Sequence, residues 1–282
     1  MSASGAVASA DGASGRVAVV TGGGAGIGRA IVLRLARGGA RVAVLDIRAE
    51  TAQETLALAG DDGAGAAFAC DVSDSAAVDA VFERIAAELG QPDVLVNNAG
   101  AIGLDHVRRV TPLLAQQRAE AAGEGIKTPL DALVRLTDEE WRRMLAIHLD
   151  GTFYCTRAAV RMMAPRGRGV VVNMSSICGL EGCTGHPHYS AAKAAVLGFT
   201  KAAAKELIVQ GIRVNAVAPG HVDTSTLKGE INEQRAAIAR GTPAGRLATP
   251  DEVAATVAFL ASDDAAFYVG AVLSPNGGLV TA

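Results

Sequence analysis

Short apolar runs alternate along this chain with longer segments of helical spacing, and this alternation limits the possible folds more than any other feature. Residues 16–21 (RVAVVT) and 41–46 (RVAVLD) carry apolar side chains without polar alternation, which is typical of strands buried on both faces. Further apolar runs lie at 66–70, 93–97, 170–174, 213–217 and 271–273. Because strands that alternate with helices form right-handed crossovers, the sequence predicts an α/β fold with one parallel sheet.

The composition indicates one sizeable core and gives no reason to expect a macromolecular partner. Half of the 282 residues are hydrophobic but only 4% are aromatic, so the core must be built from Ala, Val, Leu and Ile. The net charge of -3 favours neither nucleic acid nor an anionic membrane as a partner. Since the chain has no internal repeat and no linker, residues 15–282 are expected to form a single domain.

The N-terminal residues and the cysteines both indicate a cytoplasmic protein. Residues 1–14 are small and polar, lack the basic start and apolar stretch of a secretory signal, and are expected to be a flexible tail. No apolar run approaches the roughly 20 residues that span a bilayer. All four cysteines are expected to be free thiols, without a Cys178–Cys183 disulfide and without metal-ligand spacing: Cys70, Cys155, Cys178 and Cys183.

One segment, residues 101–136, interrupts the pattern of strands and helices. It contains Gly, Pro, Gln and several charges, and it ends before a helix start with Thr137 at the cap and acids in the first turn. Two interpretations stay open. The segment is a surface excursion that contains a helix over 113–122, or it forms part of a substrate wall or a subunit contact, because ligands bind where parallel strands end.

A glycine-rich turn joins the first predicted strand to the first predicted helix. The segment 21–28 (TGGGAGIG) has the spacing G-x-x-x-G-x-G. A pyrophosphate needs close approach to backbone N–H groups at the positive end of a helix, and glycines remove the Cβ atoms that would block it. A glycine cluster alone also makes ordinary turns, but its place between strand and helix predicts a dinucleotide site.

Asp46 ends the second predicted strand, 18 residues after Gly28. A carboxylate there accepts hydrogen bonds from both hydroxyls of an adenosine ribose and repels the 2′-phosphate of NADP. The sequence therefore predicts NAD as the cofactor. Two alternatives stay open: Asp46 is a cap or turn residue, or the nearby Arg48 offsets the repulsion and NADP is used.

Tyr189 and Lys193 are four residues apart in a helical stretch (YSAAK), which places both side chains on one helix face. A tyrosine has an ordinary pKa of about 10, and a nearby ammonium is expected to lower the pKa of the phenol. Tyr189 can then exchange a proton with an alcohol or ketone. Ser176 ends the fifth predicted strand, and its hydroxyl can hold the substrate oxygen.

In these motifs the chain resembles the short-chain dehydrogenases/reductases, from about Gly15 to Gly278. The matching pieces, in order, are TGGGAGIG (21–28), Asp46, Asp71-Val72, NNAG (97–100), SS (175–176), YSAAK (189–193), PGHVDT (219–224) and NGG (276–278). The resemblance implies a Rossmann-like doubly wound parallel sheet flanked by helices, in one domain. It also implies a homotetramer.

The resemblance implies roles for single residues as well. Ser176, Tyr189 and Lys193 are the implied catalytic set. The implied cofactor contacts are Gly22, Gly26, Ile27 and Gly28 along the pyrophosphate, Asp46 at the adenosine ribose, Asp71 and Val72 beside the adenine, Asn98 and Ala99 beneath the cofactor, Tyr189 and Lys193 at the nicotinamide ribose, and Val222 and Thr224 at the carboxamide.

The chain departs from the family pattern at His148, in LAIHLDGTF, where the family usually has a catalytic asparagine that holds a water in a proton relay. An imidazole both donates and accepts hydrogen bonds and titrates near neutrality, so His148 can replace that asparagine. Alternatively, His148 is a packed helix histidine with no part in a relay. If it titrates, His148→Asn should keep activity and change its pH dependence below neutrality.

The expected function is NAD-dependent interconversion of a secondary alcohol and a ketone. The residues do not separate a 3-oxoacyl-thioester reductase from a hydroxysteroid or polyol dehydrogenase, because fold does not name substrate. The alternative is a dinucleotide-binding regulatory or scaffold protein with weak catalysis, since His148 replaces the usual asparagine. No metal is expected, because His186, His188 and His221 have no recognisable ligand geometry.

Overall fold

The computed structural model describes residues 14–60, 65–123, 125–224 and 232–281. Residues 1–13, most of the predicted flexible tail, lie outside this part of the chain. Within the described residues, no helix is long and apolar enough to cross a membrane, and no group of three or more His, Cys, Asp or Glu side chains could hold a metal ion.

Seven parallel strands form one sheet in the order β3-β2-β1-β4-β5-β6-β7. The prediction of an α/β fold with a parallel sheet is confirmed, and each strand lies within one residue of its predicted range. The strands are β1 Val17–Thr21, β2 Arg41–Asp46, β3 Gly65–Ala69, β4 Val94–Asn97, β5 Gly169–Met174, β6 Ile212–Val217 and β7 Val272–Leu273.

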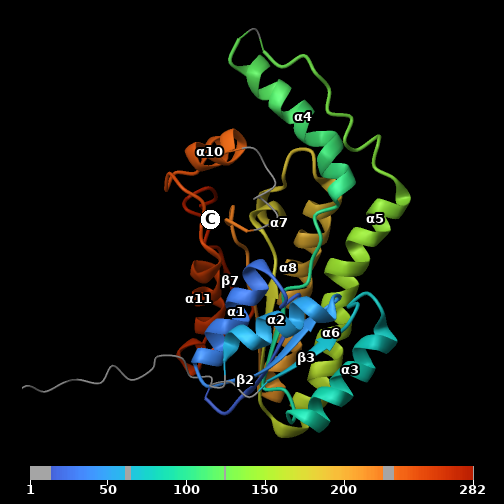
Figure 1. The fold of residues 1–282 in the computed structure, drawn as a ribbon, viewed down its shortest axis with the longest axis vertical. Helices are drawn as coiled ribbons and strands as arrows, with labels where there is room; N and C mark the ends of the chain where they lie inside the picture. Colours follow the sequence, from blue (N-terminus) through green and yellow to red (C-terminus); the bar gives the residue numbers. More distant parts are fainter. Residues whose placement is uncertain (1–13, 61–64, 124, 225–231, 282) are drawn as a thin grey trace, which may run out of the picture.

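Helices cover both faces of this sheet (Figure 1), which makes the fold Rossmann-like. Successive β1 residues pack into different clusters: Ala18 and Val20 lie with α1, α2 and α11, whereas Val17 and Val19 lie with α3, α6 and α8. The five strands from β2 to β6 in the sheet order are therefore apolar on both sides, as the sequence predicted, whereas the edge strands β3 and β7 are only partly buried. These helices are α1 Gly26–Arg37, α2 Ala49–Ala59, α11 Pro250–Ala261, α3 Ser75–Glu88, α6 Gly151–Met163 and α8 Pro187–Leu207.

The order of the strands determines where a ligand can bind. The chain moves outward from β1 through β2 to β3 and then returns to β4 on the other side of β1. At such a reversal, the loops that follow neighbouring strands diverge and leave a crevice at the carboxyl ends of the strands. The site is therefore expected at the carboxyl ends of β1 and β4.

The segment 101–136 carries one long helix, α4 Leu104–Ala121. The predicted helix over 113–122 was too short, because Pro112 lies inside α4 rather than before it. In Figure 1, α4 and the chain after it extend away from the sheet, beyond α7 (Ile177–Glu181) and the start of α8. The chain returns to the body of the fold through α5 (Asp138–Leu145), which starts with a capping box between Thr137 and Glu140.

Candidate active site

A pocket of about 470 Å³ lies at the carboxyl ends of β1, β2 and β4. Its wall combines the glycine turn after β1, the end of β2, the residues after β3 and the residues after β4, although these segments are far apart in the sequence. The sequence-predicted residues on this wall are Gly22, Gly26, Ile27, Gly28, Asp46, Asp71, Val72, Asn98, Ala99 and Thr224. The structure therefore gathers ten predicted cofactor contacts into one pocket.

The glycine turn has room only for glycine at two of its positions. A Cβ on Gly28 would lie 2.0 Å from the Gly22 carbonyl oxygen and 2.5 Å from Asn98 Nδ2. A Cβ on Gly22, whose φ is +62°, would lie 2.8 Å from the Ala99 Cα. Asn98 Nδ2 in turn donates to the carbonyl oxygens of Thr21 and Gly22, at 3.0 and 3.1 Å, so β4 holds the turn in shape.

The first turn of α1 lines this pocket with Gly26, Ile27 and Gly28. The N-cap residue is Ala25, and no side chain caps the helix. The first N–H groups of a helix lack partners within the helix and carry its positive end, so they can bind an anionic group. A turn without Cβ atoms that leads to an uncapped helix start fits the pyrophosphate of a dinucleotide.

Asp46 stands at the rim of the pocket with its carboxylate fixed by the backbone. Its Oδ2 accepts a hydrogen bond from the Gly24 N–H at 3.0 Å, and its Oδ1 accepts one from the Arg48 N–H at 3.1 Å. These two bonds orient the carboxylate, and Asp46 remains half-exposed. The carboxylate therefore provides a fixed negative charge at the end of β2.

Asp71 lies on the same wall, beside Arg143, which the sequence analysis missed. Burial raises the pKa of Asp71, but hydrogen bonds from Ser73 and the positive charge of Arg143 outweigh this effect and hold the pKa below its ordinary value. Arg143 belongs to α5, and its Nη2 lies 3.6 Å from an Asp71 carboxylate oxygen. No sequence pattern links the two residues, because only the packing of α5 brings them together.

Ser176 and Lys193 are held in place at the end of β5. Ser176 is the N-cap of α7, and its Oγ accepts a hydrogen bond from the Cys178 N–H at 3.2 Å. Lys193 is 5% exposed, and its Nζ donates to the Met174 carbonyl oxygen at 2.7 Å. The same Nζ lies 5.7 Å from the centre of the Tyr189 ring. The predicted trio is therefore brought together, although none of the three lines the 470 Å³ pocket itself.

The electrostatics of Tyr189 differ from the prediction. The expected lowering of its pKa by Lys193 is wrong for this structure: burial raises the pKa of Tyr189, and a hydrogen bond with Ser176 offsets only part of the rise. Burial also lowers the pKa of Lys193 to about 7, so the amine beside the phenol is only partly protonated at neutral pH. Both shifts have one cause, since low-dielectric surroundings disfavour the charged form of each group.

His148 connects the pocket to the trio. It lies in a short π-helix, η1 (Ala146–Asp150), and is 3% exposed. Its ring packs edge-on against Tyr189 at 5.4 Å between centres, and its Nε2 lies 2.8 Å from the Ala101 carbonyl oxygen. The Ala101 N–H lies 3.2 Å from the same Nε2, so this nitrogen meets both backbone groups of Ala101, whereas Nδ1 has no partner among the described residues.

Of the two interpretations of His148 that the sequence leaves open, titration near neutrality is contradicted, and a packed histidine agrees with the structure. Burial lowers the pKa of His148 to about 3, and the positive charge of Lys193 contributes to the shift. The imidazole is therefore neutral at physiological pH. The sequence could not show this, because the shift depends on how completely the surrounding helices exclude water.

Val222 and Thr224 lie differently with respect to the pocket. Val222 is buried and forms a parallel bridge with Ala248, whereas Thr224 lines the pocket. The contacts of both residues with the carboxamide of the cofactor stay predictions.

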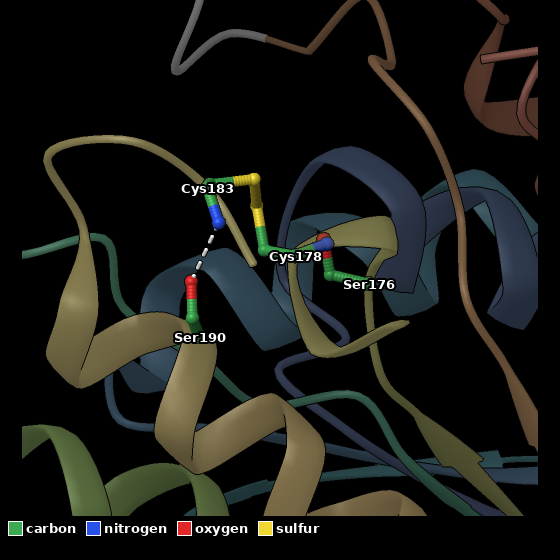
Figure 2. Close-up of a disulfide and its surroundings, with 4 residues drawn as sticks. All are labelled: Ser176, Cys178, Cys183 and Ser190. Carbon is green, nitrogen blue, oxygen red and sulfur yellow. Dashed lines mark hydrogen bonds between the residues drawn. A yellow bond between two sulfur atoms is a disulfide. The ribbon is translucent and has the colours of Figure 1, made fainter. Parts of the chain in front are cut away.

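The expectation of four free thiols is wrong for one pair. Cys178 and Cys183 form a disulfide with their Cα atoms 4.9 Å apart, in the loop between Ser176 and α8 (Figure 2). The single turn of α7 followed by Gly182, at φ +81°, turns the chain back and brings the two cysteines within bonding distance. Cys70 and Cys155 are free and buried, as expected.

The segment 101–136 is packed against the same loop. His106 Nε2 lies 2.6 Å from the Gly185 carbonyl oxygen, and its ring centre lies 4.4 Å from that of His188. A Cβ on Gly185 would lie 2.7 Å from Val110 Cγ1. Helix α4 thus contacts the residues that lead into Tyr189, which supports the interpretation of the segment as part of a substrate wall.

Comparisons with known proteins agree with this geometry. A family model described as short chain dehydrogenase matches residues 16–236. The chain is 42% identical over 264 residues to the cis-4-hydroxycyclohexanecarboxylate dehydrogenase of Sinomonas cyclohexanicum, covering 93% of this chain and 96% of that protein. It is 37% identical over 265 residues to the 3-oxoacyl-(acyl-carrier-protein) reductase of Escherichia coli strain K12, covering 94% and 97%. The corresponding reductase of Pseudomonas aeruginosa is 38% identical over 268 residues, with coverage of 94% and 97%.

Proposed function

Because this chain belongs to the short-chain dehydrogenase/reductase family, whose members are oxidoreductases acting on CH–OH groups, we propose that it interconverts a secondary alcohol and a ketone with NAD(H). The observation that carries the proposal is the position of Ser176, Tyr189 and Lys193 beside the end of β5, next to a pocket that fits a dinucleotide. We propose these three residues as the catalytic set.

The fit of the dinucleotide depends on the glycine turn. The positions that Cβ atoms of residues 22 and 28 would take are already filled by the backbone of the turn and of the residues after β4. This tight bend leaves its outer side and the start of α1 open to a pyrophosphate. When bound, the nicotinamide supplies or takes up the hydride; the protein supplies binding, orientation and proton exchange.

Tyr189 is the proposed proton-exchanging group. Its raised pKa keeps the phenol protonated at neutral pH, so it can donate its proton to the oxygen of a ketone. Ser176, which hydrogen-bonds to Tyr189, orients that oxygen. Lys193, held by the Met174 carbonyl, supplies a nearby positive charge in its protonated form, which favours the loss of the phenol proton.

We propose that His148 is a positioning residue in this site. As a neutral imidazole it holds the Ala101 backbone through Nε2 and supports one edge of the Tyr189 ring. It occupies the position of the family's asparagine but does not need to change charge during the reaction.

We therefore expect His148→Asn to leave the shape of the pH–rate profile between pH 5 and 8 unchanged. The pKa of His148 is about 3, so the group stays neutral throughout this range in the parent. The loss of one aromatic contact, worth about 0.5–1.5 kcal/mol, should lower kcat by at most about tenfold. The profile of kcat against pH measures both effects. A limb below pH 7 that is present in the parent and missing in the variant would contradict this role.

The cofactor proposal predicts that the parent prefers NADH and that Asp46→Asn weakens the preference. Asparagine keeps the size and an acceptor oxygen, but it removes the negative charge that would face a 2′-phosphate. We expect KM for NADPH to fall by about tenfold, since one exposed charge pair is worth about 1 kcal/mol or somewhat more. Initial rates with both cofactors measure the ratio, and Asp71→Asn, on the adenine side of the pocket, is the matched control. A parent that prefers NADPH would reject the proposed NAD specificity.

A panel of substrates tests the function itself. The named activities of the relatives suggest two starting classes, cyclic alcohols that bear a carboxylate and 3-oxoacyl thioesters, to which hydroxysteroids and polyols are added. Turnover of any of them supports the proposal. Tight NADH binding without turnover of any would favour a dinucleotide-binding regulatory or scaffold protein. The homotetramer and the cytoplasmic location stay predictions.

A further inference from the structure

The disulfide between Cys178 and Cys183 joins the two sides of the loop that connects Ser176 to the start of α8, where Tyr189 lies. On one side, the Cys178 N–H donates to Ser176 Oγ at 3.2 Å. On the other side, the Cys183 N–H donates to Ser190 Oγ at 2.9 Å, one residue from Tyr189 (Figure 2). The cross-link therefore connects a residue that contacts Ser176 to one that contacts the first turn of α8.

The middle of this loop is open to solvent, because residues 180–182 and 184 are exposed. Helix α7 has only five residues, and Gly182 lies in the left-handed region with no described atom within 4 Å of an added Cβ. Apart from the cross-link, the loop is held near its two ends: the Ile177 N–H donates to the Pro219 carbonyl oxygen, and Gly185 contacts His106 and Val110. Both cysteines are half-buried rather than enclosed, so a thiol can reach them.

The loop also packs directly against the proposed catalytic lysine. A Cβ on Gly179, in the middle of α7, would lie 2.6 Å from the Lys193 carbonyl carbon and 2.8 Å from Ser175 Oγ. Helix α7 is therefore in direct contact with the backbone of Lys193 as well as with Ser176.

We propose that Cys178 and Cys183 form a redox modification site at which a dithiol reductant opens the disulfide and lowers turnover at the neighbouring Ser176–Tyr189 pair. A thiolate of the reductant attacks one cysteine sulfur and breaks the S–S bond, which gives a mixed disulfide and one cysteine thiolate. The second thiol of the reductant then displaces the other cysteine. The two cysteines gain two electrons and two protons, and the reductant leaves as its own disulfide.

This regulation rests on the proposed function, so the test separates the two. The full chain is treated with diamide or with dithiothreitol, and its thiols are counted by intact mass after alkylation in denaturant. The oxidised chain should take up two labels, on Cys70 and Cys155, and the reduced chain four. Ketone turnover, NADH affinity and backbone hydrogen exchange are then measured on both forms.

Reduction should lower kcat/KM for the ketone by about fivefold, less than the roughly hundredfold loss that follows from a 1 Å misplacement, because the loop is loosened and not moved. NADH affinity should change by less than about twofold, since no pocket residue belongs to the loop. The amides of Gly182 and His186, which donate to the carbonyls of Cys178 and Cys183, should exchange faster. The double variant Cys178→Ser/Cys183→Ser should have the kcat/KM of the reduced form, and dithiothreitol should not change it. Cys155→Ala should lose kcat/KM on reduction as the parent does.

Four labels on the diamide-treated chain would overturn the proposal, as would equal kcat/KM and equal exchange in the two forms. The exchange measurement needs no substrate. If the chain turns over no ketone, the proposed enzyme activity is rejected, and the proposed effect of reduction on turnover is rejected with it. Faster exchange of these amides in the reduced form would still show that the disulfide holds the loop.

Discussion

Replacing Tyr189 with phenylalanine should lower kcat for ketone reduction by about 10²- to 10⁴-fold, the range that a positioned proton donor contributes. The side chain is half-buried beside Ser176, and the phenol keeps its proton at neutral pH because desolvation raises its pKa. Phenylalanine keeps the ring that packs against His148 and removes only the hydroxyl. We therefore expect NADH affinity within about threefold of the parent, since the glycine turn that carries the pyrophosphate is untouched.

The measurement is kcat and KM for the best ketone of the substrate panel, with NADH affinity from a fluorescence titration. Tyr268→Phe is the matched control, because Tyr268 packs against Phe259 at the far edge of the sheet and should give parental rates. Retention of more than about a tenth of the parental kcat in Tyr189→Phe would show that another group exchanges the proton.

Replacing Gly28 with alanine should lower NADH affinity by about 100-fold, which corresponds to about 3 kcal/mol. The added Cβ would lie 2.0 Å from the Gly22 carbonyl oxygen, a backbone atom that cannot turn aside as a flexible side chain would. The turn must therefore open, which moves the N–H groups at the start of α1. Forcing an extra methyl into a packed region also lowers the free energy of unfolding, by about 1–3 kcal/mol.

Gly198→Ala provides the matched control for this second variant. Gly198 lies in α8, and no described atom lies within 4 Å of a Cβ added there. Alanine at such a helical position should raise the free energy of unfolding by about 0.4–1 kcal/mol and leave NADH binding unchanged. Urea denaturation and NADH titration compare the two variants. Parental NADH affinity in Gly28→Ala would mean that the cofactor does not bind against this turn.

The fold was predictable because its signals are local. The buried strands, such as β1 (17–21) and β2 (41–46), are short runs of mostly apolar side chains whose length and lack of alternation already indicate burial on both faces. The glycine spacing of 21–28 likewise depends on a conformation that a few adjacent residues must adopt. Helix α4 starts earlier than predicted and continues through Pro112, a residue type that usually ends or kinks a helix, so its length could not be predicted from local signals.

The sequence by itself determined the parallel sheet, the glycine turn and the set of side chains at the strand ends, since those follow from the order and periodicity of residue types. Only the tertiary structure decided the partner of Asp71, the neutral state of His148, the raised pKa of Tyr189 and the pairing of Cys178 with Cys183. These properties depend on distances between residues separated along the chain and on how much water is excluded around them. The free energy of ionising a group depends on the atoms and the water around it, and the order of residue types along the chain does not specify which atoms these are.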